Sequence, residues 1–168
     1  MHEHAHDRLT GRRWPYDGRS DRSGTTDGAE RDADVRDIRI GAKALVTSPE
    51  RVLLIEERHA DGSSFWTLPG GGVEPDESLP ECLRREVDEE IRCGATVDAA
   101  VGSYIYAHRS RPVTTLYAVF GATLHAVPEP NSDEQVIDHG WWEPGELPPA
   151  TLDPVAEFIT KRADPDRK

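Results

Sequence analysis

The chain has 168 residues and a formal net charge of −12, with a pI near 5.0. Arginine supplies nearly all of the positive charge, because lysine occurs only as Lys43, Lys161 and Lys168. A chain of this length fits one domain with its own core. Its acidity would repel a polyanion at long range, so we expect no general nucleic-acid binding.

Sequence features of membrane and secreted proteins are absent from this chain. No apolar run reaches the length that spans a bilayer, and no basic start followed by an apolar stretch resembles a signal peptide. The two cysteines, Cys82 and Cys93, are too few for a disulfide framework or a Cys-x-x-Cys metal site. We therefore expect a cytoplasmic protein that does not contact membranes, and we interpret both cysteines as small buried side chains.

The first residues of the chain differ in composition from the rest. Residues 1–36 are rich in Asp, Arg, Gly and Ser and lack apolar periodicity. Such a segment cannot bury enough surface to offset the entropy lost on ordering, which predicts a disordered tail. We expect one domain over residues 37–162 and a short tail over residues 163–168.

Several segments of the expected domain are predicted to be strands. Short apolar blocks and alternating apolar and polar residues indicate this conformation. The expected strands cover residues 38–46, 52–55, 65–68, 97–106, 114–126 and 139–143. Arg39 and Lys43 interleave with the apolar residues of the first strand. An amphipathic helix over residues 151–161 closes the chain.

Another helix is predicted after the triple glycine at residues 70–72. Ser78 and Glu81 have the spacing of a capping box, which places the helix start near Ser78. A buried stripe recurs every four residues, at Leu79, Leu83, Val87 and Ile91. At about 100° per residue, three glutamates share another face of the helix: Glu86, Glu89 and Glu90.

This glutamate face has two interpretations. On a solvated helix, like charges one turn apart cost only a few tenths of a kcal/mol, so the face can be an ordinary exposed surface. In a partly buried groove, carboxylates about 4 Å apart repel by roughly 4 kcal/mol per pair at an effective dielectric of about 20. A hard divalent cation such as Mg²⁺ or Mn²⁺ would relieve that repulsion.

The spacing around the helix favours the second interpretation. The stretch follows the order G-x5-E-x7-R-E-V-x-E-E, and its fixed residues are Gly71, Glu77, Arg85, Glu86, Glu89 and Glu90. From Gly71 to Cys93 it resembles the Nudix box, the signature of the Nudix hydrolases. Arg92 stands where the family has glycine, and Cys93 where it has a bulky apolar residue. Because that glycine normally ends the helix in a left-handed conformation, we expect Gly94 to take over the helix end.

The resemblance implies a fold and a reaction. The fold is of the α+β class, the Nudix α/β/α sandwich with a central mixed sheet. The reaction is attack by water on a phosphorus of a pyrophosphate linkage in a nucleoside diphosphate derivative, with Mg²⁺ or Mn²⁺ as cofactor. By position in the motif, the metal ligands are the carbonyl of Gly70 and the carboxylates of Glu86, Glu89 and Glu90. Arg85 would orient a catalytic glutamate. Gly71 and Glu77 would brace the catalytic loop, which begins at the triple glycine and leads into the helix.

Two polar loops downstream contain further candidate residues. Arg109 and Arg111 lie between two expected strands and could meet a substrate phosphate or base, or simply form a solvated turn. In many Nudix hydrolases an acidic loop before a tryptophan strand sends a glutamate to the metal site. Glu134 is the matching candidate for the catalytic base, with Asp133 as the alternative.

The sequence leaves the substrate and the assembly open. ADP-ribose, nucleotide sugars, dinucleotides and nucleoside triphosphates all fit the family resemblance, and a homodimer is one option for the oligomeric state. Two other functions also remain: a Nudix-fold regulatory domain that binds a nucleotide without cleaving it, and a protein whose acidic helix binds metal only to stabilise the fold.

Overall fold

The computed structural model describes residues 36–109, 111–164 and 166. Residues 1–35 of the segment predicted to be disordered, and residues 165, 167 and 168 of the predicted tail, lie outside the described residues, and the domain limits stay a prediction. The elements in chain order are β1 (Asp37–Leu45), β2 (Thr47–Ser48), β3 (Arg51–Arg58), β4 (Ser64–Thr67), β5 (Gly70–Gly72), α1 (Leu79–Ile91), β6 (Ala95–Ala107), β7 (Val113–Leu124), the short 3-10 helix η1 (Ser132–Glu134), β8 (Val136–Trp142) and α2 (Asp153–Ala163).

The strands form two sheets. The first has the order β5-β1-β7-β6, in which β1 runs parallel to β7 while the other pairs are antiparallel. The second is antiparallel and has the order β2-β3-β4, with β8 pairing along β3. The sequence prediction of an α+β fold with a mixed sheet is confirmed.

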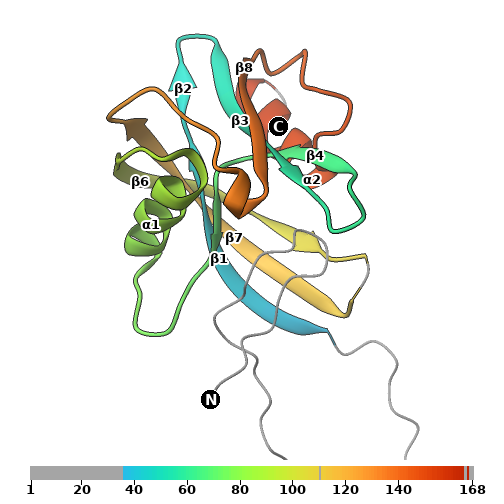
Figure 1. The fold of residues 1–168 in the computed structure, drawn as a ribbon. Coiled ribbons are helices and arrows are strands. Elements are labelled where there is room, and N and C mark those ends of the chain that lie inside the picture. Colours follow the sequence, from blue (N-terminus) through green and yellow to red (C-terminus); the bar gives the residue numbers. More distant parts are fainter. Residues whose placement is uncertain (1–35, 110, 165, 167–168) are drawn as a thin grey trace, which may run out of the picture.

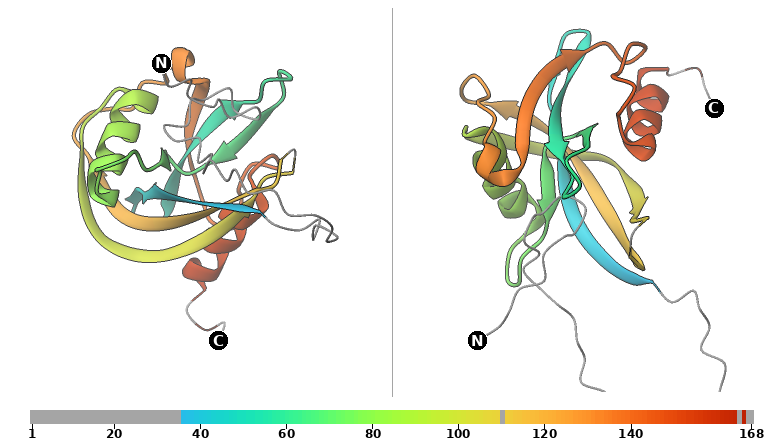
Figure 2. Two further views of the ribbon diagram at one scale, coloured as in Figure 1. Left: turned by 90° about the horizontal axis from the view of Figure 1, so that it is seen from below. Right: turned by 45° about the vertical axis from the view of Figure 1, so that its right-hand side comes forward.

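The two helices lie on opposite sides of the sheets, α1 to the left of β1 in Figure 1 and α2 behind β3 and β4, and Figure 2 gives two further views. Strand β3 is buried on both faces, and its side chains alternate between the two helices. Leu53 and Ile55 join the cluster around α1, whereas Val52 and Leu54 join the cluster around α2. This arrangement is the expected α/β/α sandwich.

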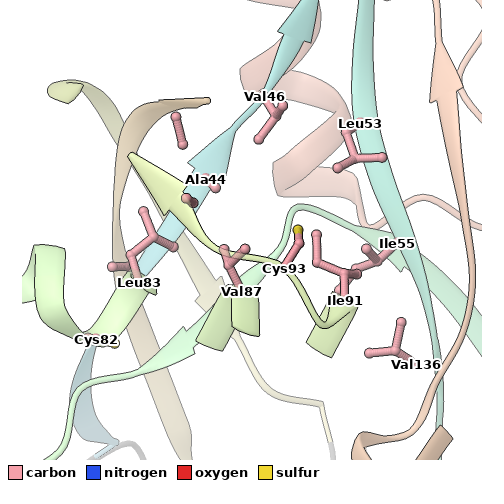
Figure 3. Close-up of a cluster of buried hydrophobic side chains, with 13 residues drawn as sticks. Ala44, Val46, Leu53, Ile55, Cys82, Leu83, Val87, Ile91, Cys93 and Val136 are labelled. Carbon is pink, nitrogen blue, oxygen red and sulfur yellow. The ribbon is translucent and has the colours of Figure 1, made fainter. Parts of the chain in front are cut away.

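Helix α1 is held by its apolar stripe. Leu83, Val87 and Ile91 are completely buried, and Figure 3 shows them beside side chains from β1 and β3. Burial of each such side chain contributes about 1.5–3 kcal/mol. The capping box is also confirmed, since the hydroxyl of Ser78 accepts from the Glu81 amide and the Glu81 carboxylate accepts from the Ser78 amide.

The triple glycine forms a strand rather than the expected loop. Strand β5 pairs with β1, with Gly70 opposite Lys43 and Gly72 opposite Gly41. Gly70 has φ +132°, and a Cβ at this position would collide with the carbonyl oxygen of Ala42. Only glycine fits there, because it lacks a side chain and tolerates positive φ.

The closing helix begins two residues later than predicted. Thr151 bridges to Trp66 of β4, and the amide of Leu152 donates to the Trp66 carbonyl at 3.0 Å. These bonds hold residues 151 and 152 in an extended conformation, so α2 starts at Asp153. Among the described residues, neither helix has an apolar stretch that could cross a membrane.

Candidate functional site

Three glutamates of α1 meet the glycine strand. The Glu86 and Glu90 residues are 5% and 0% exposed, while the side chain of Glu89 is 40% exposed. Glu90 Oε1 accepts from the Gly70 amide at 3.0 Å. A Cβ on Gly71 would lie 2.6 Å from Cδ of Glu86, so the glycine backbone packs directly on this carboxylate. The groove interpretation of the acidic face therefore agrees with the burial of two of its three members.

Arg85 connects the loop, the helix and the strand. Its Nε and Nη2 donate to the two carboxylate oxygens of Glu77 at 2.8 and 3.1 Å, the bidentate geometry that favours arginine. Its Nη1 donates to Glu86 Oε1 at 3.0 Å and to Glu89 Oε2 at 3.3 Å, and Nη2 donates to the Gly72 carbonyl at 3.2 Å. These contacts fit the orienting role predicted for Arg85 and the bracing role predicted for Glu77.

This network shifts the protonation of its members. The hydrogen bonds from Arg85 hold the pKa of the Glu77 carboxyl below its usual range. Burial works against the charged guanidinium, yet Glu77 and Glu86 raise the pKa of Arg85 above its usual range. One guanidinium thus faces four carboxylates, those of Glu74, Glu77, Glu86 and Glu89, and Glu90 adds a fifth. The formal charge of the site is strongly negative, which favours a bound cation.

The buried cysteines do not fit the role of a nucleophile. The thiol of Cys82 lies 3.6 Å from the Gly71 carbonyl, where only a small side chain fits under the glycine strand. Burial raises the pKa of Cys82 to about 12, and burial also raises the pKa of Cys93. Both thiols are therefore expected to stay protonated at neutral pH, in agreement with the prediction that both are small buried side chains.

Lys43 contacts the glycine strand, a position that sequence reasoning did not predict. Its Nζ donates to the carbonyls of Gly70 and Leu68 at 2.8 and 3.1 Å, and it lies 5.0 Å from the centre of the Tyr117 ring. The residue is only 5% exposed. The one available signal was a lysine within an otherwise apolar stretch of strand, in a chain that has three lysines.

The predicted end of α1 at Gly94 is wrong. Arg92 itself adopts the left-handed conformation, with φ 50° and ψ 39°, and Gly94 is not among the described residues with positive φ. The Arg92 guanidinium donates to Glu129 at 3.3 Å and to Asn131 at 3.0 Å. These contacts act against the roughly 1–2 kcal/mol that a left-handed conformation costs a residue with a Cβ, although exposed contacts of this kind contribute only about 0–1 kcal/mol each.

The acidic loop packs on this same end of α1. Asn131 donates to the Glu89 carbonyl through its side chain at 2.7 Å and to the Glu90 carbonyl through its amide at 2.9 Å. Asn131 also caps η1, the short helix that contains Asp133 and Glu134. The candidate base Glu134 is thereby attached to the helix end that carries two of the three glutamates.

The two loop arginines lie far from the glutamates. Arg109 and Arg111 sit in the β6–β7 connection, where Val113 pairs with Asp37 at the start of β1. Gly71 pairs with Ala42, five residues along the same strand, which corresponds to about 16 Å. Their predicted substrate contact therefore requires a ligand that extends along β1.

The described residues contain no ready-made metal cluster. Within residues 36–109, 111–164 and 166, no three His, Cys, Asp or Glu side chains are arranged to hold an ion. The physical reason is that Arg85 hydrogen-bonds both Glu86 and Glu89. The donor set still suits a hard divalent cation, because it combines several carboxylates with the Gly70 carbonyl under a negative formal charge. Glu86 and Glu89 would have to turn away from Arg85 to bind it.

Comparisons with known proteins identify relatives over most of the described chain. The family model described as NUDIX domain matches residues 37–162. The CTP pyrophosphohydrolase of Escherichia coli K12 is 28% identical over 129 residues, which cover 71% of this chain and 90% of the relative. The nucleoside triphosphatase NudI of Escherichia coli O1:K1 is 32% identical over 91 residues, or 49% of this chain and 64% of the relative.

Solved structures show the same fold. The MutT protein from Methanosarcina mazei Go1 aligns with a TM-score of 0.66 at 23% identity, covering 79% of this chain and 98% of its own. The ORF135 protein of E. coli aligns with a TM-score of 0.62 at 24% identity, covering 79% and 96%.

Proposed function

This chain belongs to the Nudix family of pyrophosphohydrolases, and we propose that it hydrolyses a nucleoside triphosphate to a nucleoside monophosphate and pyrophosphate. The observation that carries the proposal is the partly buried glutamate face of α1, which Arg85 and the Gly70 amide hold beside the glycine strand. Both curated relatives described above are named for action on nucleoside triphosphates. That shared chemistry favours triphosphates over ADP-ribose, nucleotide sugars and dinucleotides.

The proposed cofactor is Mg²⁺, with Mn²⁺ as a substitute. Its ligands would be the Gly70 carbonyl and the carboxylates of Glu86, Glu89 and Glu90. When bound, such a cation neutralises phosphate oxygens and lowers the pKa of water. Glu86 and Glu89 would give up their hydrogen bonds to the Arg85 guanidinium in order to hold the cation. Arg85 would keep its contacts with Glu77 and so hold the loop in place.

The reaction proceeds by attack at phosphorus. The water oxygen forms a bond to phosphorus on one side of the P–O–P bridge, and the bond from that phosphorus to the bridging oxygen breaks. Glu134 takes the proton released by the water, or Asp133 does so in its place. The anchorage of Asn131 to the Glu89 and Glu90 carbonyls holds this loop beside the glutamates.

One panel of substrates tests the proposal. Nucleoside triphosphates, ADP-ribose, nucleotide sugars and dinucleoside polyphosphates are each assayed with Mg²⁺, with Mn²⁺ and with excess chelator. We expect triphosphates to be cleaved fastest, with pyrophosphate released and no turnover in chelator. In ¹⁸O-water, the label should enter a phosphate-containing product.

Three results would contradict the proposal. Tight binding of several nucleotides without turnover of any would favour the regulatory domain. Metal-dependent melting with neither turnover nor nucleotide binding would favour a structural metal. Faster turnover of ADP-ribose or a nucleotide sugar than of every triphosphate would reject the substrate class while retaining the chemistry.

A further inference from the structure

Lys43 is a charged group buried inside the domain. A buried ammonium is unfavourable by several kcal/mol unless polar partners replace its water shell. Here the partners are two backbone carbonyls and the face of the Tyr117 ring. Within the described part of the chain, Nζ has no carboxylate partner. The ammonium therefore occupies a position built from the acceptors that cations prefer.

The position of this ammonium connects it to the glutamate face. Its shortest hydrogen bond, 2.8 Å, goes to the carbonyl of Gly70. The amide of the same residue donates to Glu90 at 3.0 Å. Gly70 is thus held through its carbonyl by a cation and through its amide by a carboxylate. Since the Gly70 carbonyl is also the proposed backbone ligand of the divalent metal, Lys43 and that metal share one oxygen.

We propose that Lys43 is a built-in competitor of the divalent cation, which keeps the affinity of the site for free metal low in the absence of nucleotide. The inference rests on the proposed metal site and deepens it. The ammonium competes for the Gly70 carbonyl and repels a second positive charge nearby. Phosphates supply the negative charge that offsets this repulsion, so the metal binds preferentially together with the nucleotide. By linkage, the metal then strengthens nucleotide binding by the same factor.

The proposal is tested by metal binding rather than by turnover. Mn²⁺ is titrated into the full-length protein without nucleotide, and free Mn²⁺ is measured by electron paramagnetic resonance. Lys43→Met removes the charge and keeps an unbranched side chain that is only one heavy atom shorter. We expect its Kd for Mn²⁺ to fall about tenfold, because the competing charge near the site is gone. The same titration with a non-hydrolysable triphosphate present should show a smaller difference.

Two further variants isolate the effect of charge at this site. Lys43→Arg keeps a cation beside Gly70, and its Mn²⁺ affinity should stay within about twofold of the wild type. Lys161→Met removes an equivalent charge from the surface of α2, where the side chain is 67% exposed and pairs with Glu157. It should bind Mn²⁺ like the wild type. If Lys43→Met does not fold, Lys43→Gln replaces it, because the neutral amide keeps two N–H donors in the buried polar position.

The outcomes separate this inference from the proposed function. Unchanged or weaker Mn²⁺ binding in a neutral Lys43 variant that still melts cooperatively would overturn it, and would leave Lys43 as a support of the backbone only. Wild-type protein that binds no Mn²⁺ in either state would overturn both proposals. Mn²⁺ binding that tightens in Lys43→Met, in a protein without any turnover, would uphold the competition and reject the hydrolase.

Discussion

The two ends of α1 are built in different ways. At the start, Ser78 and Glu81 cap the helix over three residues, and Arg85 reaches Glu77 over eight. At the other end, Arg92 contacts residues 37 and 39 positions away, and Asn131 contacts a carbonyl 42 positions away. The first end is therefore specified by its own stretch of sequence, and the second by a distant loop.

The difference shows that a sequence motif specifies local geometry only where all of the contacting residues lie inside the motif. Every member of the first end lies inside the motif, so its spacing fixes the geometry. The second end combines an unfavourable backbone at Arg92 with compensating contacts to Glu129 and Asn131. The sequence alone predicts neither the left-handed backbone of Arg92 nor the loop contacts that compensate for it. The two ends can be compared directly by substitution, because each has an arginine.

The largest effect on turnover is expected for substitutions in the glutamate face, which lies between the two ends of α1. Glu90→Gln and Glu89→Gln keep the shape of the side chain but remove the charge that would hold the cation. Turnover should fall by about 10³-fold or more, as the loss of several kcal/mol of transition-state stabilisation implies. Circular dichroism should show an intact fold. Glu146→Gln, at an exposed position, is the matched control, and near-normal turnover in Glu90→Gln would contradict this site.

The next effect compares the two arginines. Arg85→Lys keeps a charge but loses the bidentate contact with Glu77 and the contacts with Glu86 and Glu89, and turnover should fall about 100-fold. Arg92→Lys changes contacts between largely exposed side chains, and turnover should change less than about threefold. Equal losses in the two variants would remove the distinction between the ends.

A smaller effect concerns stability and pH. The hydrogen bonds from Arg85 lower the pKa of Glu77, so the folded protein binds this proton less readily than the unfolded chain does. The resulting stabilisation is fully present above the ordinary value of 4.5 and is lost as the pH falls through the lowered pKa. Glu77→Gln should reduce the free energy of unfolding by about 2 kcal/mol at pH 7.

Denaturant titrations of wild type and Glu77→Gln between pH 7 and pH 3 provide the measurement. The difference in free energy of unfolding between wild type and Glu77→Gln should become smaller in the acidic part of that range. Glu129→Gln, at the other helix end, removes a carboxylate whose side chain is 70% exposed, and should change stability by only a few tenths of a kcal/mol. A gap that stays constant down to pH 3 would show that the stabilisation does not come from the ionised Glu77.

The smallest effect is expected at the end of α1. Arg92→Gly relieves about 1 kcal/mol of backbone strain and loses contacts of similar size, so the free energy of unfolding should stay within about 0.5 kcal/mol of the wild type. Amide exchange at Asn131 should nevertheless become faster. A loss above about 2 kcal/mol would show that the guanidinium contacts dominate over the backbone.

Gly94→Ala gives the complementary test. A Cβ there would lie 2.9 Å from Nδ1 of His125, and the backbone needs no left-handed residue. Its cost depends only on how far the exposed His125 ring can shift, so a loss of at most about 1 kcal/mol is expected. Thermal melting of Gly94→Ala and of Arg92→Gly, each compared with the wild type, measures the change in stability of both variants. A larger loss in Gly94→Ala would point to a backbone constraint at this glycine after all.

The sequence predicted the parts of the fold that depend on local spacing. The capping box at Ser78, the apolar stripe through Val87 and the shared face of Glu86 and Glu90 all follow from helical periodicity. The pairing of the glycine strand with β1 did not, because strand pairing depends on residues about 30 positions apart. The burial of Lys43 was missed for the same reason, since the carbonyls that receive it belong to Leu68 and Gly70.

The short crossing between the two sheets has a consequence for how this protein can change over evolution. Strand β4 ends at Thr67 in one sheet, and β5 begins at Gly70 in the other. Only Leu68 and Pro69 lie between them, so an inserted residue would move Gly70 away from both Lys43 and Glu90. The loop over residues 59–63, which joins β3 to β4 within one sheet, carries no such constraint. An insertion in that loop would therefore leave the glycine strand in place, while the passage from Thr67 to Gly70 must keep its length.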